Sequence, residues 1–366
     1  MKLLHFADLH LDAPFAWAPA AVASRRRQAI RDALREICRI ARERNVDALT
    51  CAGDLYEQER FTGDTSQFLV STFAELHPLP VLVAPGNHDW LAPSSIYETA
   101  AWSSNVHIFR SDRLEPLDLA PGFTVWGGGH RAPANTDDFL HDFRARALGV
   151  NVGLFHASER STLPHQEAGK QPHAPFSAHE IADAGLDHAL LGHYHTPVDG
   201  ADYTYPGNPE PLSFGETGER GAVLVEVDRE GSVRRERIRV AQTVVEDVGV
   251  DISGAGNFQE VLDRLREAVA GHSGIVRVSL RGDVSPSLSL DRIQLEQSAD
   301  GLEYMLVRTD DVRPVYDLDT IRTETTVRGQ FVRDVLAATI DDNEQRRVLI
   351  TGLRALSGRA DLEVGE

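Results

Sequence analysis

Five short segments of the sequence carry carboxylate, amide and imidazole side chains in close succession. In chain order, these segments contain Asp8 and His10, then Asp54, then Asn87, His88 and Asp89, then His156, and finally His193 and His195. If His88 and Asp89 are set aside, the remaining side chains are carboxylates, an amide and imidazoles, all of which can bind a metal ion. Mixed nitrogen and oxygen ligands of this kind suit Mn²⁺, Fe²⁺ or Zn²⁺ better than Mg²⁺ or Ca²⁺. The residue types therefore predict a transition-metal centre.

The number of candidate ligands favours two metal ions over one. A single catalytic ion with open positions cannot use all of them, whereas two ions that share one carboxylate can. Two ions about 3.5–4 Å apart can generate a hydroxide and stabilise both the attacking and the leaving oxygen of a phosphoryl displacement. His88, beside Asn87, is then free to act on the phosphate or the leaving group. Alone, the Asn87–Asp89 segment is equally typical of a polar turn, so the prediction depends on all five segments.

Each segment directly follows an apolar run that predicts a buried strand, at residues 2–6, 46–51, 81–83, 151–155 and 188–191. Helices are expected over 23–44 and 65–75 because apolar residues recur there at helical spacing. Parallel strands joined by right-handed crossovers bring the first three segments to one edge of one sheet. Ligands usually bind at that edge in open α/β sheets. On an extended chain, Asp8 and His10 point to one side, as do His193 and His195.

The remaining segments predict more strands around this core. Short strands are expected at 106–109, 123–126 and 203–206, and a closing hairpin at 222–227 and 232–240. Residues 159–178 are polar and predict a surface loop. We expect the three nearby histidines to face solvent rather than a metal; they are His165, His173 and His179.

The pattern of residue types along the sequence changes near residue 243, which predicts further domains. We expect a catalytic domain over 1–242, a small α+β domain over 243–315 and a helical tail over 316–366. The α+β domain contains an amphipathic helix from Phe258 to Val269 and an alternating strand from Val276 to Leu280. The tail either packs on its own body or presents an apolar face to a partner protein.

Composition sets the broad class of protein. The chain has 366 residues, of which 42% are hydrophobic and 25% charged, and this is typical of a globular protein. The 2 cysteines are too few for a disulfide framework or a thiolate zinc site. The sequence has no apolar run long enough to span a membrane, and its first residues lack the pattern of a signal peptide. A cytoplasmic protein without membrane contact is expected.

The net charge of −19 argues against a simple nucleic-acid-binding protein, because such proteins usually carry a basic stripe. The basic runs are short and are typical of solvated faces; they lie at 25–27 and 234–239. If DNA is the substrate, bound cations or a partner must offset the negative charge. The chain also lacks a glycine-rich nucleotide loop of either common type.

The order of the motifs, D-x-H, G-D, G-N-H-D, H and G-H-x-H, resembles the calcineurin-like metallophosphoesterase superfamily over roughly residues 1–240. The first motif, Asp8–Phe15, together with the small domain and the helical tail, resembles the SbcD-type DNA-repair nucleases, especially their YhaO-like branch. This resemblance implies an α/β fold with mixed β-sheets sandwiched by helices, followed by a small α+β capping domain and a C-terminal helical tail.

The resemblance also implies residue roles. One metal would be held by Asp8, His10 and His195, and the other by Asn87, His156 and His193, with Asp54 bridging. His88 would contact the scissile phosphate and protonate the leaving 3′-oxygen, and Asp89 would orient His88. The two divalent ions would be Mn²⁺.

The implied function is hydrolysis of DNA in a repair complex of the SbcCD type, as an exonuclease, with endonucleolytic cleavage left open. The resemblance implies a nucleoid-associated homodimer. Its capping domain would help to seat DNA, and its tail would dock on the coiled-coil base of an SMC-like ATPase of the SbcC type. The missing Walker A motif agrees with an ATPase that is supplied by another chain.

Two other functions stay open from the sequence. The first is a metallophosphodiesterase for a small substrate such as a cyclic nucleotide, although such an enzyme has no need of residues 243–366. The second is an inactive subunit that bridges DNA and an ATPase, although its complete set of candidate ligands argues against this. A phosphoprotein phosphatase is less well supported, because residues 55–58 lack the arginine that follows the G-D turn in those enzymes.

Overall fold

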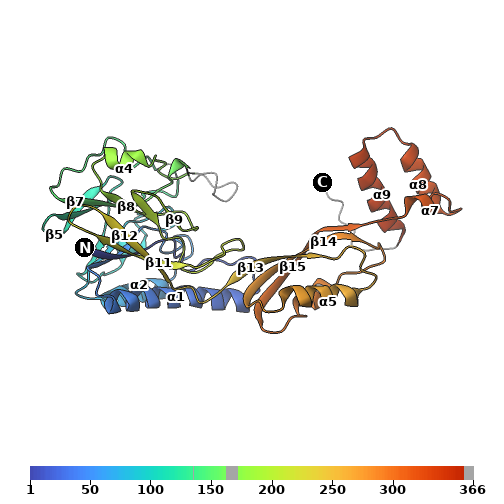
Figure 1. Cartoon of the computed structure of the whole chain (residues 1–366), viewed down its shortest axis with the longest axis horizontal. Helices are drawn as coiled ribbons and strands as arrows, with labels where there is room; N and C mark the ends of the chain where they lie inside the picture. Colours follow the sequence, from blue (N-terminus) through green and yellow to red (C-terminus); the bar gives the residue numbers. More distant parts are fainter. Residues whose placement is uncertain (135, 162–171, 358–366) are drawn as a thin grey trace. The chain divides into compact units, whose positions relative to one another are not determined.

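The computed structural model describes residues 1–134, 136–161 and 172–357 (Figure 1). The chain divides into two compact units, Met1–Val245 and Glu246–Glu366, which are described separately below. His165 lies outside the described residues.

The first unit contains two six-stranded mixed sheets. The first sheet has the order β12-β11-β1-β2-β3-β4. Strands β1 to β4 are parallel to one another, β11 is antiparallel to β1, and β12 is antiparallel to β11. Its strands are β1 (Lys2–Phe6), β2 (Ala48–Cys51), β3 (Val81–Val83), β4 (Val106–Ile108), β11 (Gly221–Val227) and β12 (Val233–Arg239).

The second sheet has the order β5-β6-β7-β8-β10-β9, with a parallel centre from β6 to β10 and an antiparallel strand at each edge. Its strands are β5 (Glu115–Ala120), β6 (Phe123–Gly127), β7 (Val150–His156), β8 (His188–Gly192), β9 (Val198–Asp199) and β10 (Tyr203–Tyr205). The predicted core strands are confirmed, while β5 and β9 were not predicted. β5 alternates weakly and is mostly half-exposed, so its hydrophobic signal is faint.

The two sheets pack face to face, and helices cover their outer faces. Helices α1 (Ala20–Glu43) and α2 (Gly63–Ala74) lie on the first sheet, and α4 (His179–Asp183) lies on the second (Figure 1). A short helix, α3 (Ile96–Thr99), follows β3. The layer between the sheets is apolar, with Leu3, Leu82, Val152 and Leu190 among its buried residues. The predicted α/β fold with sheets sandwiched by helices is confirmed.

Helix α1 shows how the sequence builds these layers. Its buried residues recur every three or four positions, as at Ile30, Leu34 and Ile37, so one face of the helix packs on the first sheet. Arg26 lies on the same buried face, where its guanidinium donates to Glu210 at 2.7 Å and to the Pro211 carbonyl at 2.8 Å. The charge is therefore paired, as burial requires.

The second unit contains a three-stranded sheet of order β13-β14-β15. Its strands are β13 (Val245–Asp251), β14 (Gly274–Val284) and β15 (Leu302–Pro314), and its helices are α5 (Phe258–Val269) and α6 (Arg292–Glu296). The side chain of Asn257 accepts a hydrogen bond from the Glu260 amide and so caps α5. Val261 and Leu265 of α5 pack with Val276 and Val278 of β14 in one buried cluster.

Three helices follow β15 in this unit: α7 (Leu318–Ile321), α8 (Val327–Ala337) and α9 (Asp342–Leu356). They share a small core that includes Ile321, Val332, Leu349 and Leu353. The helical character predicted after residue 316 is confirmed up to residue 357. No helix within the described ranges is both long enough and apolar enough to cross a membrane.

His5 of β1 makes a polar link between the two sheets. Its Nε2 lies 3.0 Å from the Leu191 carbonyl of β8, so Nε2 donates, and Nδ1 lies 3.1 Å from the Thr50 hydroxyl. Burial lowers the pKa of His5 to about 4, and burial also lowers the pKa of the nearby His188 to about 3. Both imidazoles are therefore neutral in the folded protein near neutral pH.

We expect acid to destabilise the fold through these groups. The unfolded chain takes up protons near pH 6.5, whereas folded His5 does so only near pH 4, so the free energy of unfolding falls as pH drops from about 6.5 to 4. The loss from His5 alone is on the order of 3 kcal/mol, since each pKa unit corresponds to about 1.4 kcal/mol. Urea unfolding of metal-free protein across this range should show a shallower decline for His5→Gln than for the wild type. The exposed His141→Gln is the control, and an unchanged slope for His5→Gln would contradict the prediction.

Candidate metal centre

The predicted site residues lie at the carboxyl ends of strands from both sheets. Asp8 and His10 follow β1, Asp54 follows β2, and Asn87, His88 and Asp89 follow β3. His156 ends β7, and His193 and His195 follow β8. The parallel order β1-β2-β3 brings the first three segments together, as predicted. The last two segments reach the same place from the second sheet.

The backbone at these residues differs from the expectation of an extended chain. Asp8 and His10 have φ angles of 55° and 52°, Asp54 has 52°, and His193 has 110°. The alternation of an extended strand therefore does not explain the pairing of Asp8 with His10. Instead, the chain turns through the left-handed region, which is uncommon for residues other than glycine. Such strained residues concentrate at functional sites, where the surrounding structure holds them in place.

Glycines allow the strand ends of the two sheets to approach closely. A Cβ atom on Gly86 would lie 2.3 Å from Asp54 Oδ1 and 2.9 Å from His156 Nδ1. A Cβ atom on Gly192 would lie 2.0 Å from the Ala52 carbonyl oxygen. Any side chain at either position would push the donor residues apart, so the glycines of these motifs have a steric role at the site.

Asp8, His10 and His195 form one group of converging donors. One ligand atom from each lies within 4.8 Å of the others. The Nδ1 atom of His10 lies 2.7 Å from Glu57 Oε1, and since a carboxylate can only accept, Nδ1 carries the proton. The Nε2 atom of His10 is buried, lies 3.6 Å from Asp54 Oδ2 and has no hydrogen-bond partner among the described residues.

Asp54, His156 and Asn87 form a second group. The Nδ1 atom of His156 donates to the Ala52 carbonyl at 2.8 Å, which leaves Nε2 facing the site. That Nε2 lies 3.0 Å from Asn87 Oδ1 and 3.3 Å from Asp54 Oδ2. Asp54 thus lies near His10 on one side and His156 on the other.

His193 lies beside the second group. Its backbone amide donates to Asp8 Oδ1 at 2.9 Å, and its ring centroid lies 5.2 Å from that of His156. The three sets of converging ligand atoms found among the described residues do not include His193. The ring of His173 lies 5.3 Å from that of His193 and is half-buried. His173 is thus only partly exposed and belongs to none of these sets of ligand atoms, whereas His179 is exposed as expected.

His88 stands at the exposed side of the centre. Its side chain is 45% exposed, and its Nδ1 donates to Glu57 Oε2 at 2.9 Å. The same carboxylate holds His10 through Oε1. Glu57 therefore fixes both imidazoles, and the sequence analysis did not identify it. Its position three residues after Asp54, in the same strand-end segment, was the signal that could have revealed it.

Asp89 has a different role from the one expected. Its carboxylate accepts hydrogen bonds from three backbone amides and from the Tyr97 hydroxyl; the amides are those of Asp54, Leu55 and Gly86. Among the hydrogen bonds of the described residues, none joins Asp89 to the His88 ring. Asp89 therefore fixes the two turns after β2 and β3, and Glu57 is the residue that orients His88.

Glu216 is a second buried carboxylate that the sequence analysis missed. Its Oε1 lies 2.9 Å from His195 Nδ1, so Nδ1 donates and the Nε2 atom remains for a cation. Asn208, Leu212 and Ser213 also donate to Glu216. Spacing could not have revealed this contact, because Glu216 is brought to His195 by a loop after β10.

Charge interactions inside the centre shift several pKa values. Burial alone would raise the pKa of Asp54, but His156 and His88 outweigh it and hold that pKa well below its usual value. Burial lowers the pKa of His88 and of His156, yet Asp54 raises each to about 9. Burial raises the pKa of Glu57, but hydrogen bonds from His10 and His88 lower it to about 2. The carboxylates of Asp54 and Glu57 are thus ionised and stabilised by the neighbouring imidazoles.

The donor set fits two divalent cations. Asp8 and Asp54 are ionisable carboxyls buried within a few ångströms of His156, and His10 has a buried Nε2 without a hydrogen bond among the described residues. Buried carboxylates of this kind are usually paired or bound to metals. Carboxylate oxygens, an amide oxygen and imidazole nitrogens together suit Mn²⁺, Fe²⁺ or Zn²⁺.

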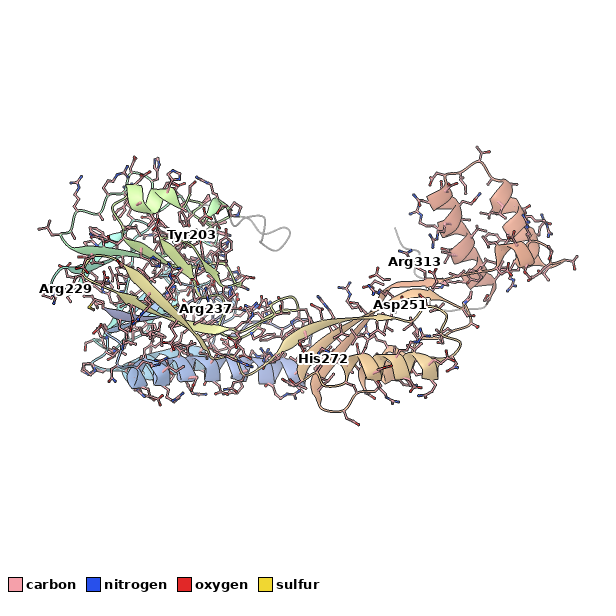
Figure 2. The ribbon with its side chains drawn as sticks, viewed as in Figure 1. Tyr203, Arg229, Arg237, Asp251, His272 and Arg313 are labelled. Atoms are coloured by element: carbon pink, nitrogen blue, oxygen red, sulfur yellow. The ribbon has the colours of Figure 1, made fainter. Side chains whose placement is uncertain are left out.

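The basic run on β12 does not form a free phosphate-binding stripe. Arg237, labelled in Figure 2, pairs with Asp199 at 2.9 Å, and Arg235 lies 3.6 Å from the same carboxylate. Arg234 pairs with Glu226 of the adjacent strand β11. These arginines are engaged in ion pairs, as expected for a solvated face.

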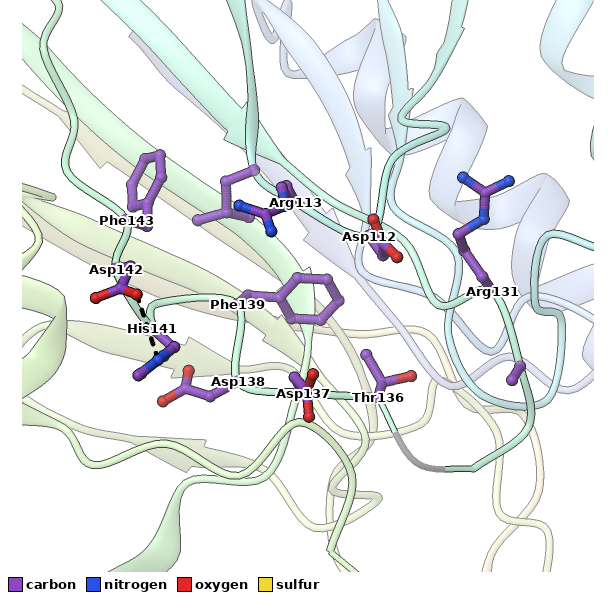
Figure 3. Close-up of a pocket in the computed structure, with 12 residues that line it drawn as sticks. Asp112, Arg113, Arg131, Thr136, Asp137, Asp138, Phe139, His141, Asp142 and Phe143 are labelled. Atoms are coloured by element: carbon purple, nitrogen blue, oxygen red, sulfur yellow. Dashed lines mark ion pairs between the residues drawn. The ribbon is translucent and has the colours of Figure 1, made fainter.

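None of the predicted site residues lines a surface cavity of about 400 Å³ (Figure 3). Its walls include Asp112, Arg113 and Asp138, and its one drawn ion pair joins His141 to Asp142 at 3.4 Å. Charges of both signs alternate around it, so the cavity favours no particular ligand.

Comparison with known proteins agrees with this geometry. The family model for calcineurin-like phosphoesterases matches residues 1–197. The metallophosphoesterase YhaO of Bacillus subtilis is 29% identical over 303 residues, covering 77% of this chain and 72% of YhaO. The DNA double-strand break repair protein Mre11 of Methanopyrus kandleri is 27% identical over 334 residues, covering 82% of this chain and 69% of that protein.

A second protein of that name, from Haloferax volcanii, is 26% identical over 388 residues and covers 100% of this chain and 76% of its own length. The family model spans more than half of the chain and includes all five motif segments. The chain therefore belongs to the calcineurin-like phosphoesterase family and is a metal-dependent hydrolase of phosphate esters.

Proposed function

We propose that this protein is a two-metal phosphodiesterase that hydrolyses DNA, acting with Mn²⁺ as the nuclease subunit of an SbcCD-like repair complex. The convergence of donors from five strand ends beside the half-exposed His88 carries the proposal. Similarity to proteins named for double-strand break repair supports DNA as the substrate. The main action is exonucleolytic, with endonucleolytic cleavage as a second outcome to be tested.

We propose the ligand sets that the family resemblance implies, and the convergence of Asp8, His10 and His195 and of Asp54 with His156 supports them. Asp8, His10 and His195 would hold one ion, Asn87, His156 and His193 the other, and Asp54 would lie between them. When bound, two such ions supply a hydroxide nucleophile and neutralise charge on the phosphate. Glu57 would hold the Nδ1 atom of His88, which leaves Nε2 to donate a proton to the leaving oxygen.

The second unit would contact DNA and the ATPase and would take no part in the hydrolysis itself. We assign residues 243–315 to a capping domain that helps to seat DNA and residues 316–366 to docking of an SMC-like ATPase of the SbcC type. Helices α8 and α9 support this assignment, because they leave large apolar side chains exposed: Val327, Leu336, Val348 and Leu356. A homodimer in the cytoplasm, associated with the nucleoid, completes the proposal.

The decisive experiment is a nuclease assay with Mn²⁺ on 5′- and 3′-labelled linear DNA, both duplex and single-stranded. Bis-p-nitrophenyl phosphate serves as a small diester, and His88→Ala as a control with reduced activity. Cleavage of both substrates by the wild type, reduced in His88→Ala, would support a DNA nuclease and give its polarity. Cleavage of the small diester only, even with an SbcC-type ATPase present, would favour an enzyme for small phosphodiesters. No cleavage of either would favour a bridging subunit.

We expect charges on the exposed apolar side chains of α8 and α9 to block docking of the ATPase. Val327→Glu combined with Val348→Glu should weaken binding of an SbcC-type ATPase from the same organism by about tenfold or more, because an interface would have to bury two unpaired charges. Binding would be measured by biolayer interferometry, and hydrolysis of the small diester should stay unchanged. Thr325→Glu adds a charge at a nearby exposed position as a control. Equal binding by all variants would exclude this surface.

A further inference from the structure

Glu216 is held by a network of hydrogen bonds that ends on His195. The carboxylate is only 5% exposed. Its Oε2 accepts from Asn208 Nδ2 at 2.6 Å and from the Leu212 amide at 2.7 Å. Its Oε1 accepts from His195 Nδ1 at 2.9 Å and from the Ser213 hydroxyl at 3.1 Å. Both oxygens are thus committed to donors, and the carboxylate has little freedom to move.

The backbone of His195 is fixed by the same segment. Its carbonyl accepts from Arg220 at 2.6 Å and from the Asn208 amide at 3.2 Å. Arg220 is itself buried, and it also donates to the Glu216 carbonyl at 2.7 Å and to the Asn208 side chain. The ring and the main chain of His195 are therefore held independently by residues 208–220, which lie outside the motif that contains this histidine.

We propose that Glu216 is a positioning residue that fixes the ring orientation and tautomer of His195, so that its Nε2 lone pair faces Asp8 and His10. Because Oε1 can only accept, the His195 proton must reside on Nδ1. The Nε2 atom is then left without a proton, as a metal ligand requires. Carboxylates that act through a ligand histidine in this way typically change metal affinity 10–100-fold. This inference rests on the metal centre of the proposed function.

Glu216→Gln tests the inference with the smallest change of shape. The amide oxygen must stay beside Asn208 and Leu212, which are both donors, so the amide NH₂ faces His195 Nδ1. An NH₂ group there donates a hydrogen bond, so it favours the tautomer in which Nδ1 has no proton and Nε2 is protonated. A protonated Nε2 cannot bind a cation. The variant should therefore bind one metal ion more weakly and bind the other as tightly as the wild type does.

The measurement is titration of metal-free protein with MnCl₂ by calorimetry, with bound Mn²⁺ counted by electron paramagnetic resonance. We expect one of two ions to bind about 10–100-fold more weakly in Glu216→Gln. The exposed Glu219→Gln, three residues along the same segment, should bind both ions as the wild type does. Wild-type affinity for both ions in Glu216→Gln, or an equal loss at both, would overturn the inference.

Two further measurements separate positioning from a merely structural role. In a His195→Gln background, Glu216→Gln should add no further loss of Mn²⁺ affinity, whereas additive losses would overturn the proposal. If Glu216→Gln does not fold, long-range ¹H–¹⁵N spectra of the metal-free wild type decide, with His195 assigned by comparison with His195→Gln. A proton on Nδ1 alone supports the inference, and a proton on Nε2 refutes it. None of these measurements uses DNA, so a failure of the proposed nuclease activity would be recognised separately.

Discussion

Asp54→Asn is expected to abolish phosphodiester hydrolysis and to reduce the number of bound Mn²⁺ ions. The carboxylate lies between the two donor groups, with Oδ2 placed 3.6 Å from His10 Nε2 and 3.3 Å from His156 Nε2. An amide removes the negative charge that two cations would share. The fall in kcat should be at least about 10²–10³-fold, the scale on which the loss of one electrostatic group affects a transition state.

The fold of this variant should persist, because an asparagine oxygen can still accept from the His88 amide as Asp54 Oδ1 does at 2.8 Å. Circular dichroism and the thermal transition of metal-free protein would check this. Asp112→Asn replaces an exposed carboxylate at the rim of the surface cavity and should leave activity and metal content unchanged (Figure 3). Substantial hydrolysis by Asp54→Asn would show that the metal ions do not share this residue.

His88→Ala is expected to lower kcat about 10²–10⁴-fold while two Mn²⁺ ions still bind. The reason is that His88 lies at the exposed side of the centre and uses Nδ1 for Glu57, so its loss removes a group that acts on the phosphate rather than a ligand. Steady-state kinetics on bis-p-nitrophenyl phosphate and on labelled DNA would measure the loss, and metal counting would show that the ions remain.

The leaving group provides a sharper test of the role of His88. If His88 protonates the leaving oxygen, the loss should be smaller for p-nitrophenolate, a good leaving group that needs no proton, than for the 3′-oxygen of DNA. His141→Ala is the control because that imidazole is 77% exposed and lines the surface cavity, which contains none of the predicted site residues. An equal loss on both substrates would assign His88 to phosphate binding instead.

The sequence was sufficient to predict the elements that carry the donors. Each donor directly follows an apolar run that predicts a buried strand, and the first three strand ends meet at one sheet edge as predicted, whereas the last two belong to the second sheet. The i, i+2 argument for Asp8 with His10 depended on an extended chain, and it was wrong because both residues lie in the left-handed region. Backbone geometry of that kind depends on neighbouring turns, here the Gly53 and Asp54 carbonyls that accept from the Asp8 and His10 amides.

The supporting carboxylates differ in how far the sequence could have revealed them. Glu57 and Glu216 each accept from the Nδ1 atom of a candidate ligand, but only Glu57 lies close to a predicted donor, three residues after Asp54. Glu216 is 21 residues away from His195 along the chain, and only the path of the loop after β10 brings them together. Local sequence patterns predict which residues could bind a metal, whereas the tertiary structure decides which other residues hold those ligands in place.

The attachment of every donor to a strand end has a consequence for how this protein can vary. Loops that do not contact a donor, such as the turn between β11 and β12, can gain or lose residues without moving a donor, because strand pairing sets the positions of the strand ends. A shift of one residue in the pairing of β7 with β8, whose residues are all buried, would instead turn side chains to the opposite face of the sheet and displace His156 relative to His193. Substrate preference can therefore change through insertions in loops, while the arrangement of the donors is preserved as long as the strand register is preserved.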